Sequence, residues 1–182
     1  PQGGTISPLL ANIALDGMEK LLKDKFNRDV CLIRYADDFV VLSKKEKIVI
    51  ESKKLLLEFL KPTGLEFSEE KTKIGHTLRG SSPGLDFLGF NFRNHQVSIH
   101  RGVKSTRGVK QNFIQITKPS QGSIKDHKKE IIVLLKKYKS APLSSVTEAL
   151  SEKIRGWTYY YSLSQCTKTF TMLDGWLWHR LW

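Results

Sequence analysis

The sequence predicts an α+β fold in which a mixed segment of helices and short antiparallel strands precedes a smaller all-helical segment. Apolar residues recur at helical spacing near the start of the chain and throughout 124–182, whereas short β-rich runs dominate between 30 and 117. The charge is uneven as well, with a net +2 over residues 1–100 and a net +10 over 101–182. The boundary is expected between Lys104 and Ser120, and we divide the chain into domains 1–112 and 113–182.

The first domain is expected to begin with a helix over 8–25, because Ser7 can cap it and proline suits a first turn. Runs of β-formers at 30–35 and 39–42 flank Ala36-Asp37-Asp38, which predicts a β-hairpin with an acidic turn. A second helix is expected over 46–60, ended by Pro62-Thr63-Gly64. Further strands are expected at 65–67, 73–77, 85–91, 97–100 and 113–117, and 101–112 is interpreted as a loop or linker.

The second domain is expected to contain three helices, over 124–138, from Ser144 or Ser145 to Tyr161, and over 169–182. A small helical module needs large residues inside, so a set of aromatic side chains is expected to pack in its core: Trp157, Tyr160 and Tyr161. The final tryptophans could serve either as core or as an interface: Trp176, Trp178 and Trp182.

The composition limits the possible partners of the chain. The formal charge is +12 and the pI is near 9.7, which points to a polyanion such as nucleic acid. An acidic membrane surface is the weaker alternative, because the lysine-rich helix lacks a broad apolar face and no run approaches the ~20 apolar residues of a membrane span. Cys31 and Cys166 are too few for a disulfide scaffold and indicate reduced thiols in an intracellular protein, either bacterial or organellar.

The acidic turn carries the most specific chemistry. Two adjacent carboxylates repel each other, and a cation usually offsets that repulsion. Hard oxygen ligands of this kind suit Mg²⁺, with Mn²⁺ as a substitute, and two such ions about 4 Å apart can promote phosphoryl transfer. Asp37 and Asp38 are therefore candidate metal ligands, whereas the simpler alternative is a plain turn, which aspartate also favours.

An ordered set of motifs resembles the reverse transcriptases encoded by group II introns, which also act as maturases. In chain order the motifs are Pro1-Gln2-Gly3-Gly4, Ser7-Pro8-Leu9-Leu10-Ala11-Asn12, Arg34-Tyr35-Ala36-Asp37-Asp38-Phe39, Gly64-Leu65, Glu70-Lys71-Thr72 and Phe87-Leu88-Gly89-Phe90. In the tail, Arg155-Gly156-Trp157 and Tyr159-Tyr160-Tyr161 resemble the thumb, or maturase-specific X domain. The resemblance covers essentially the whole chain. It implies the C-terminal part of a right-hand polymerase palm over 1–112, followed by a helical thumb over 113–182.

The resemblance also implies roles for individual residues. The catalytic set is Asp37 and Asp38, both as metal ligands, and Lys71 near the departing pyrophosphate, although Lys71 could equally be a solvated lysine. Contacts to nucleotide and template would come from Gln2, Gly3, Gly4, Tyr35 and Ala36. The primer grip would be Phe87, Leu88 and Gly89, which could also be plain core strand. In the thumb, we expect a basic set to contact RNA: Lys125, Lys128, Lys129, Lys136 and Lys137.

The implied activity is RNA-directed DNA polymerisation by two-metal phosphoryl transfer, with intron-RNA binding in splicing and retrohoming. The implied partners are intron RNA, an RNA template, a DNA primer and dNTP. The family uses a third carboxylate upstream of the Pro-Gln-Gly block, which this chain begins too late to include; Asp16, Asp24 and Asp29 are no substitutes. We therefore expect that the chain alone does not polymerise and that an upstream polypeptide half supplies the fingers and that aspartate. The alternative is a non-catalytic module that binds intron RNA.

Overall fold

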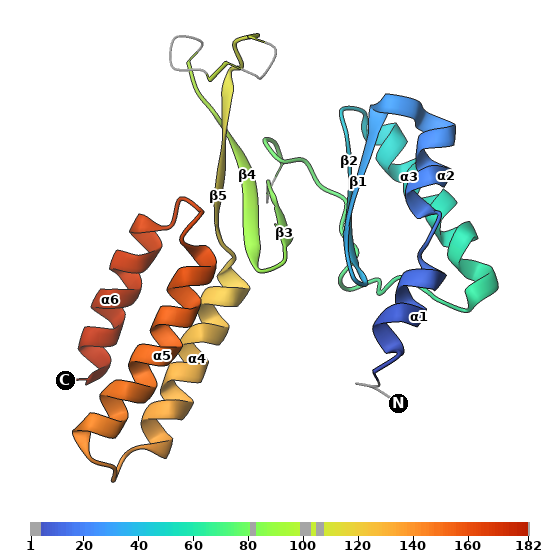
Figure 1. Ribbon diagram of the computed structural model, residues 1–182. Coiled ribbons are helices and arrows are strands. Elements are labelled where there is room, and N and C mark those ends of the chain that lie inside the picture. Colours follow the sequence, from blue (N-terminus) through green and yellow to red (C-terminus); the bar gives the residue numbers. More distant parts are fainter. Residues whose placement is uncertain (1–4, 81–82, 99–102, 105–107, 182) are drawn as a thin grey trace. The chain divides into compact units, whose positions relative to one another are not determined.

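The computed structural model describes residues 5–80, 83–98, 103–104 and 108–181. Its contacts divide into two compact units, Pro1–Ile74 (unit 1) and Gly75–Trp182 (unit 2). Both units combine helices with antiparallel strands, so the predicted α+β class is confirmed (Figure 1). The functional division into 1–112 and 113–182, and the assignment of these parts to palm and thumb, stay predictions.

In the described part of unit 1, residues 5–74, there are three α-helices and one hairpin. The elements are α1 Ser7–Ala14, α2 Met18–Phe26, β1 Val30–Tyr35, β2 Asp38–Ser43 and α3 Glu46–Leu60, with short 3-10 turns at Asn27–Asp29 and Lys61–Thr63. The hairpin and α3 follow the prediction. The single helix expected over 8–25 is wrong, because Gly17 adopts φ +89° at the start of α2 and interrupts the α-helical path. Ser7 is the first residue of α1 and does not cap it through its side chain.

The core of unit 1 lies between α2, α3 and one face of the hairpin. Met18, Leu22 and Leu56 are fully buried there. Along β1, Val30 and Leu32 face this core, as do Phe39 and Val41 on β2. Alternate strand residues point to opposite sides of the sheet, so the acidic turn is held at the end of a ribbon that is anchored on one face.

Unit 2 contains a three-stranded antiparallel sheet in the order β3-β4-β5, formed by β3 Leu85–Phe87, β4 Phe90–Gln96 and β5 Phe113–Pro119. Three helices follow: α4 Gln121–Lys137, α5 Leu143–Tyr161 and α6 Thr167–Leu181. The strand predicted over 85–91 is wrong as a single element, because Leu88 and Gly89 both have positive φ and turn the chain into a hairpin. Within the described residues, 65–67, 73–77 and 97–98 are not strands.

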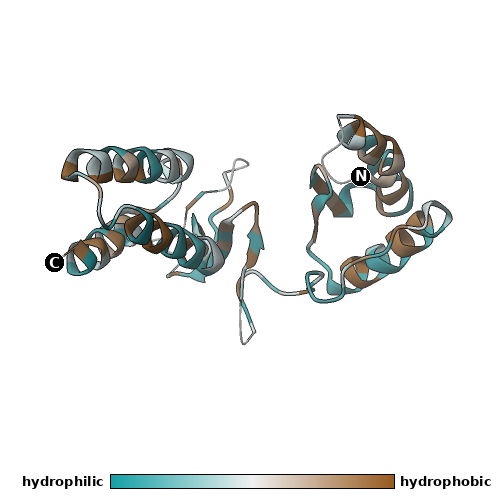
Figure 2. Cartoon of the chain, turned by 90° about the horizontal axis from the view of Figure 1, so that it is seen from below, coloured by the Kyte–Doolittle hydropathy of each residue, from teal (hydrophilic) through white to brown (hydrophobic). Residues whose placement is uncertain are grey.

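The three helices of unit 2 match the prediction within a few residues, but their first turns differ from it. Ser120 is the N-cap of α4, and its hydroxyl accepts a hydrogen bond from the Ser123 amide at 3.1 Å. Helix α5 begins directly after Pro142 and has no side-chain cap. The helices carry both hydrophobic and hydrophilic residues (Figure 2), and the hydrophobic side of an amphipathic helix is the side that packs against its neighbours.

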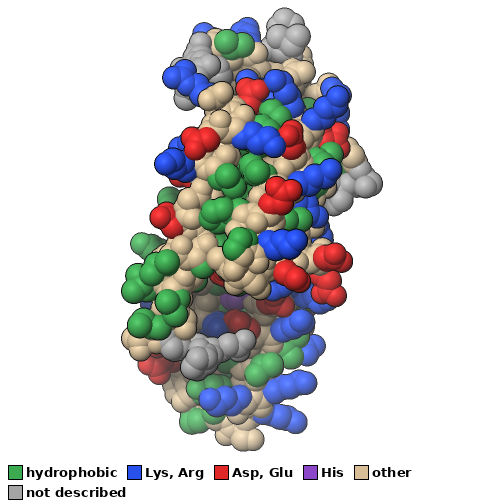
Figure 3. Space-filling view, turned by 90° about the vertical axis from the view of Figure 1, so that its right-hand side faces the viewer, with side chains coloured by type: hydrophobic (Ala, Val, Ile, Leu, Met, Phe, Trp, Pro, Cys, Tyr) green, Lys and Arg blue, Asp and Glu red, His purple; other side chains and the backbone are tan. Residues whose placement is uncertain are grey.

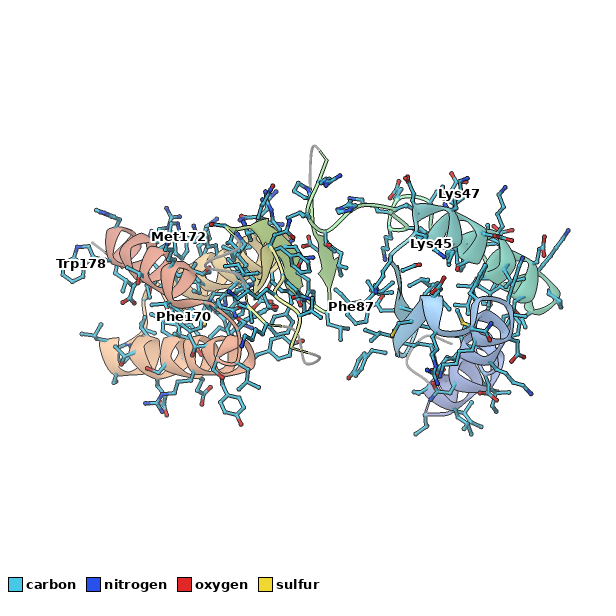
Figure 4. All side chains as sticks on the ribbon, turned by 90° about the horizontal axis from the view of Figure 1, so that it is seen from above. Lys45, Lys47, Phe87, Phe170, Met172 and Trp178 are labelled. Atoms are coloured by element: carbon cyan, nitrogen blue, oxygen red, sulfur yellow. The ribbon has the colours of Figure 1, made fainter. Side chains whose placement is uncertain are left out.

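Aromatic side chains fill the centre of this helical part. Trp157 lies 4.6 Å from the His127 ring in a stacked arrangement and 4.5 Å from Tyr161, measured between ring centroids. Phe170 of α6 approaches Trp157 at 5.9 Å, and α6 is labelled at that residue in Figure 4. The predicted core packing therefore holds for Trp157 and Tyr161, whereas Tyr160 keeps 52% of its surface exposed.

The stability of unit 2 is expected to fall in mild acid because of His127. Burial lowers the pKa of His127 below its ordinary value of 6.5, nearby Glu130 partly offsets that effect, and Lys153 adds to it. The Nδ1 atom is buried without a hydrogen-bond partner in the described structure. The unfolded chain therefore binds this proton more readily, so the stabilisation is present above about pH 6.5 and is lost as the pH falls below it.

Urea unfolding at about pH 7.5 and about pH 5.5 checks this expectation. His127→Phe retains a ring against Trp157 and should reduce the difference between the two pH values. The exposed His179, replaced by Asn, provides the matched control and should leave the difference unchanged. An equal pH difference in the wild type and in His127→Phe would contradict the role given to His127.

Candidate active site and nucleic-acid interface

The acidic turn is a two-residue connection between β1 and β2. Tyr35 pairs with Asp38 as the last rung of the hairpin, which leaves Ala36 and Asp37 at the turn itself. Ala36 adopts φ +53°, a left-handed conformation that hairpin turns of two residues require and that glycine usually supplies. A non-glycine residue in this region costs of order 1–3 kcal/mol, which must be offset by the surrounding structure. Such strain at a turn that bears two carboxylates favours a functional role.

Arg34 holds this turn in place. Its Nη1 atom donates to the Ala36 carbonyl oxygen at 2.9 Å and to Asn12 Oδ1 at 3.0 Å. The guanidinium thus connects the strained residue to α1, which belongs to the same unit. Sequence reasoning missed this role, although Arg34 and Asn12 both lie inside the quoted motifs.

Replacing Arg34 by glutamine is expected to loosen the acidic turn without unfolding unit 1. The two hydrogen bonds are worth roughly 0.5–1.5 kcal/mol each, so amide exchange near the turn should accelerate by about tenfold or more. Arg28→Gln removes an exposed arginine of the same unit and serves as the control. Hydrogen exchange followed by mass spectrometry measures both, and equal exchange rates in the two variants would contradict the bracing role.

The carboxylates of Asp37 and Asp38 are exposed, and neither forms an ion pair with another described residue. Two adjacent carboxylates that no Lys or Arg side chain of the described residues pairs with fit Mg²⁺ as a ligand. This ion binds one or two carboxylates and completes its coordination shell with water and phosphate oxygens. Over the described ranges, no group of three or more His, Cys, Asp or Glu residues could hold a metal ion by itself. The turn therefore fits as part of a metal site that substrate and a further ligand would complete.

Lys71 lies in an exposed turn, in which the amides of Lys71 and Thr72 donate to the Ser68 carbonyl oxygen at 3.2 and 2.8 Å. The segment is anchored close to the hairpin, because Phe67 packs against Phe39 with ring centroids 5.5 Å apart. Phe39 follows Asp38 directly. No hydrogen bond or ion pair between described residues joins Lys71 to the acidic turn, so the predicted role of Lys71 stays a prediction.

The Leu88–Gly89 turn of the β3–β4 hairpin is fixed to the helices of unit 2. The Tyr160 hydroxyl donates to the Leu88 carbonyl oxygen at 3.0 Å, and the Tyr161 hydroxyl donates to the Gly89 carbonyl oxygen at 3.2 Å. The Ser120 amide also donates to the Gly89 carbonyl oxygen, at 2.8 Å. Burial raises the pKa of Tyr161, and its hydroxyl also hydrogen bonds Ser123. The candidate grip residues Leu88 and Gly89 are therefore positioned by α5, a connection that sequence reasoning missed.

Helix α4 carries all five lysines of the predicted RNA-binding set, but it does not bring them together. Lys125, Lys129 and Lys136 fall on one face at helical spacing, opposite the buried Ile124, His127 and Ile131. Lys128 turns toward α6, where its Nζ lies 5.1 Å from the Trp176 ring centroid. Lys137 lies 5.7 Å from the Tyr138 ring instead. The exposed face thus retains three of the five, and Lys129 also pairs with Asp126 at 3.3 Å.

The remaining predicted positions are placed as follows. Gln2, Gly3 and Gly4 lie outside the described residues, as does Trp182. Tyr35 is 66% exposed beside the acidic turn, Phe87 is half-buried in β3, and Trp178 is 61% exposed near the end of α6 (Figure 4). Both cysteine thiols are free. None of the helices in the described ranges combines the length and apolar character needed to cross a bilayer.

A hollow in unit 1 includes the first residue of β1, at the end of that strand away from the acidic turn. It is open, measures about 1260 Å³, and is lined by residues between Lys23 and Val30. At its rim Lys45 donates to Asp29 at 2.8 Å, which lowers the pKa of that exposed carboxyl group. The hollow includes none of the predicted site residues.

Comparison with known families agrees with this geometry. A family model described as reverse transcriptase (RNA-dependent DNA polymerase) matches residues 1–92, and one described as group II intron, maturase-specific domain, matches residues 124–182. A search of curated proteins finds no match. The chain is thus of the reverse transcriptase, or nucleotidyltransferase, class, and its two domains imply nucleic acid partners. It belongs to the family of group II intron reverse transcriptases that carry a maturase-specific domain.

Proposed function

We propose that this chain supplies the metal-binding turn of an RNA-directed DNA polymerase. The observation that carries the proposal is the strained Ala36–Asp37 turn, which Arg34 braces and which presents two exposed carboxylates. A plain two-residue connection would usually carry glycine at the left-handed position rather than alanine, and it would have no need of adjacent like charges. The segment also lies within the reverse transcriptase match.

In the proposed reaction, the 3′-hydroxyl of a DNA primer gives up its proton to solvent and its oxygen attacks the α-phosphorus of a dNTP. A P–O bond forms to the primer, the bond from the α-phosphorus to the bridging oxygen of the β-phosphate breaks, and pyrophosphate leaves. Asp37 would be the principal ligand of Mg²⁺ and Asp38 its partner; when bound, the metal ions lower the pKa of the attacking hydroxyl and offset charge on the leaving oxygen. Tyr35 and Ala36 would lie beside the primer end and the nucleotide, and Gln2, Gly3 and Gly4 would contact nucleotide and template.

Lys71 would offset negative charge on the departing pyrophosphate or protonate it. Its support is the packing of Phe67 on Phe39, which ties the Lys71 segment to the strand that begins at Asp38. We further propose that a separate polypeptide supplies the fingers and a third carboxylate. The described part of this chain offers two adjacent carboxylates rather than a complete set of metal ligands.

The second proposed role is that of a maturase, in which unit 2 binds intron RNA during splicing and retrohoming. The exposed lysine face of α4 at Lys125, Lys129 and Lys136 favours phosphate contacts without sequence preference. The hairpin at Leu88 and Gly89 would grip the primer strand, and its hydrogen bonds to α5 would align it with the helices. If the chain acts without a companion, RNA binding is the function that remains.

The two roles separate in a pair of assays. The first assay is primer extension on an RNA template with Mg²⁺. The chain mixed with its companion, the separate polypeptide that supplies the fingers and the third carboxylate, should extend a primer, whereas neither polypeptide alone should do so. In filter binding, the chain alone should bind the intron RNA with an affinity that falls steeply with salt. RNA binding that survives both Asp37→Asn and a chelator would separate the RNA-binding surface from the acidic turn.

A further inference from the structure

We infer that the end of the β4–β5 ribbon is a second RNA contact, which binds the phosphate backbone of a base-paired stem. This basic tip comprises residues 103–104 and 108–111, within a segment that the sequence interpretation treated as a loop. The inference rests on the proposed binding of intron RNA and adds a site to it. The site is separate from the lysine face of α4.

The chain at the tip is paired rather than irregular. The Val97 amide donates to the Asn112 carbonyl oxygen at 2.9 Å, and the Gln111 amide donates to the Val103 carbonyl oxygen at 3.1 Å. Directly beyond the second of these bonds, Lys104 and Lys110 form an isolated antiparallel bridge, which sets them opposite each other on the two paired segments. Side chains in such pairs lie about 5 Å apart at Cβ, and like charges there are destabilising.

Nothing nearby in the sequence neutralises this pair. Residues 87–125 contain no Asp or Glu at all, while Arg93, Lys104, Lys110, Lys118 and Lys125 lie within that stretch, together with Arg101 and Arg107. Lys104 and Lys110 are exposed, and neither forms an ion pair with a described residue. At the top of Figure 3 the charged side chains beside the grey segments are blue, the colour of Lys and Arg. A polyanion is the ligand that offsets such a charge pair.

The composition of the tip favours a duplex over unpaired bases. Residues 97–112 contain no Phe, Tyr or Trp, so the tip offers no aromatic platform on which bases could stack. Contacts to phosphates need only the two lysines and a backbone that a phosphate can approach closely. At Gly108, which has φ +75°, no described residue lies within 4 Å of where a Cβ would stand.

The position of the tip also suits a helical ligand. Within unit 2 the ribbon leads away from the helices, and its tip lies at the end of β5 remote from α4 (Figure 1). Lys110 lies 11 residues before Gln121, the first residue of α4, so at about 3.3 Å per residue the two are at most about 36 Å apart. That separation is comparable with one turn of a duplex, about 34 Å in B-form DNA. We propose RNA rather than DNA as the nucleic acid bound at the tip, because β5 leads directly into the helices that match the maturase-specific domain.

The test is the double variant K104Q/K110Q of the full chain, compared with K47Q/K54Q on α3. Both variants lose two positive charges from exposed lysines that lack ion pairs in the described structure. The probes are a base-paired RNA stem, single-stranded RNA, and a DNA duplex of the same sequence. For the stem, K104Q/K110Q should bind on the order of tenfold more weakly at about 0.1 M salt, and its log–log salt slope should fall by about 2. K47Q/K54Q should match the wild type.

A second readout guards against a variant that fails to fold. Because the substitutions remove a like-charge pair, K104Q/K110Q should melt at the same temperature as the wild type or higher. Weaker stem binding with undiminished stability supports the inference. If the wild type binds RNA and K104Q/K110Q shows the same salt slope, the tip is not an RNA contact. The proposed function would remain intact in that case. A larger loss on the DNA duplex or on single-stranded RNA would overturn the choice of ligand, and a wild type that binds no RNA would overturn both proposals.

Discussion

Gly89→Ala is expected to destabilise unit 2 by about 2–4 kcal/mol, which would lower its melting temperature by on the order of 10 °C. Gly89 has φ +77°, a conformation that alanine adopts only with strain. A Cβ added there would lie 2.5 Å from the Tyr161 hydroxyl oxygen, so the tyrosine must move. Its movement would disturb the hydrogen bonds that Tyr161 makes to the Gly89 carbonyl oxygen and to Ser123. Each bond is worth about 1 kcal/mol.

Gly108→Ala separates the two causes of this loss. Gly108 has nearly the same backbone angle, φ +75°, but no atom of another described residue lies within 4 Å of an added Cβ. It should therefore show only the backbone strain, of order 1 kcal/mol. Tyr161→Phe added to Gly89→Ala removes the clashing oxygen and should restore part of the loss. Thermal unfolding followed by circular dichroism measures all three, and equal losses at Gly89 and Gly108 would contradict a docked hairpin.

Hydrophobic spacing and turn residues were enough to predict the β1–β2 hairpin, α3 and the three helices of unit 2. They failed where backbone conformation, rather than side-chain pattern, decides the outcome. Gly17 breaks a continuous apolar repeat, and Leu88 with Gly89 divides an apparently continuous strand. Positive φ at a non-glycine residue such as Leu88 depends on what holds it, here a hydrogen bond from Tyr160, which is distant in sequence.

The candidate site divides in the same way. The place of the two carboxylates could be predicted because the motif is contiguous, and the structure has Asp37 in a hairpin turn with Asp38 on the first rung after it. The residues that position them could not, because the bond from Arg34 to Asn12 spans 22 residues. The five lysines of α4 were predicted as one set, yet two of them lie near aromatic rings. Lys128 contacts Trp176 of α6, which only tertiary structure reveals, and Lys137 lies near its sequence neighbour Tyr138.

Asp37→Asn is expected to reduce nucleotide incorporation by about a thousandfold or more in the chain mixed with its companion. An amide retains the size of the carboxylate but loses the negative charge, so Mg²⁺ would lose its principal ligand at the turn. A loss of several kcal/mol of transition-state stabilisation corresponds to this factor, at 1.36 kcal/mol per tenfold. RNA binding by unit 2 should be unchanged, because Asp37 belongs to the other unit.

Asp24→Asn is the matched control, because Asp24 is an exposed carboxylate of unit 1 on α2. It changes the net charge by the same amount and should leave incorporation at the wild-type level. A comparable loss in both variants would indicate a general electrostatic effect and would contradict the role of Asp37 as a metal ligand.

The central claim, that the acidic turn is the metal site of an RNA-directed DNA polymerase, is tested most directly by primer extension on an RNA template with Mg²⁺. The chain is assayed alone, then mixed with a separately produced polypeptide that carries the fingers and the third carboxylate. The account predicts extension only in the mixture, with loss in Asp37→Asn and retention in Asp24→Asn. No extension in the mixture, with salt-sensitive RNA binding retained, would contradict the claim and leave RNA binding as the working function.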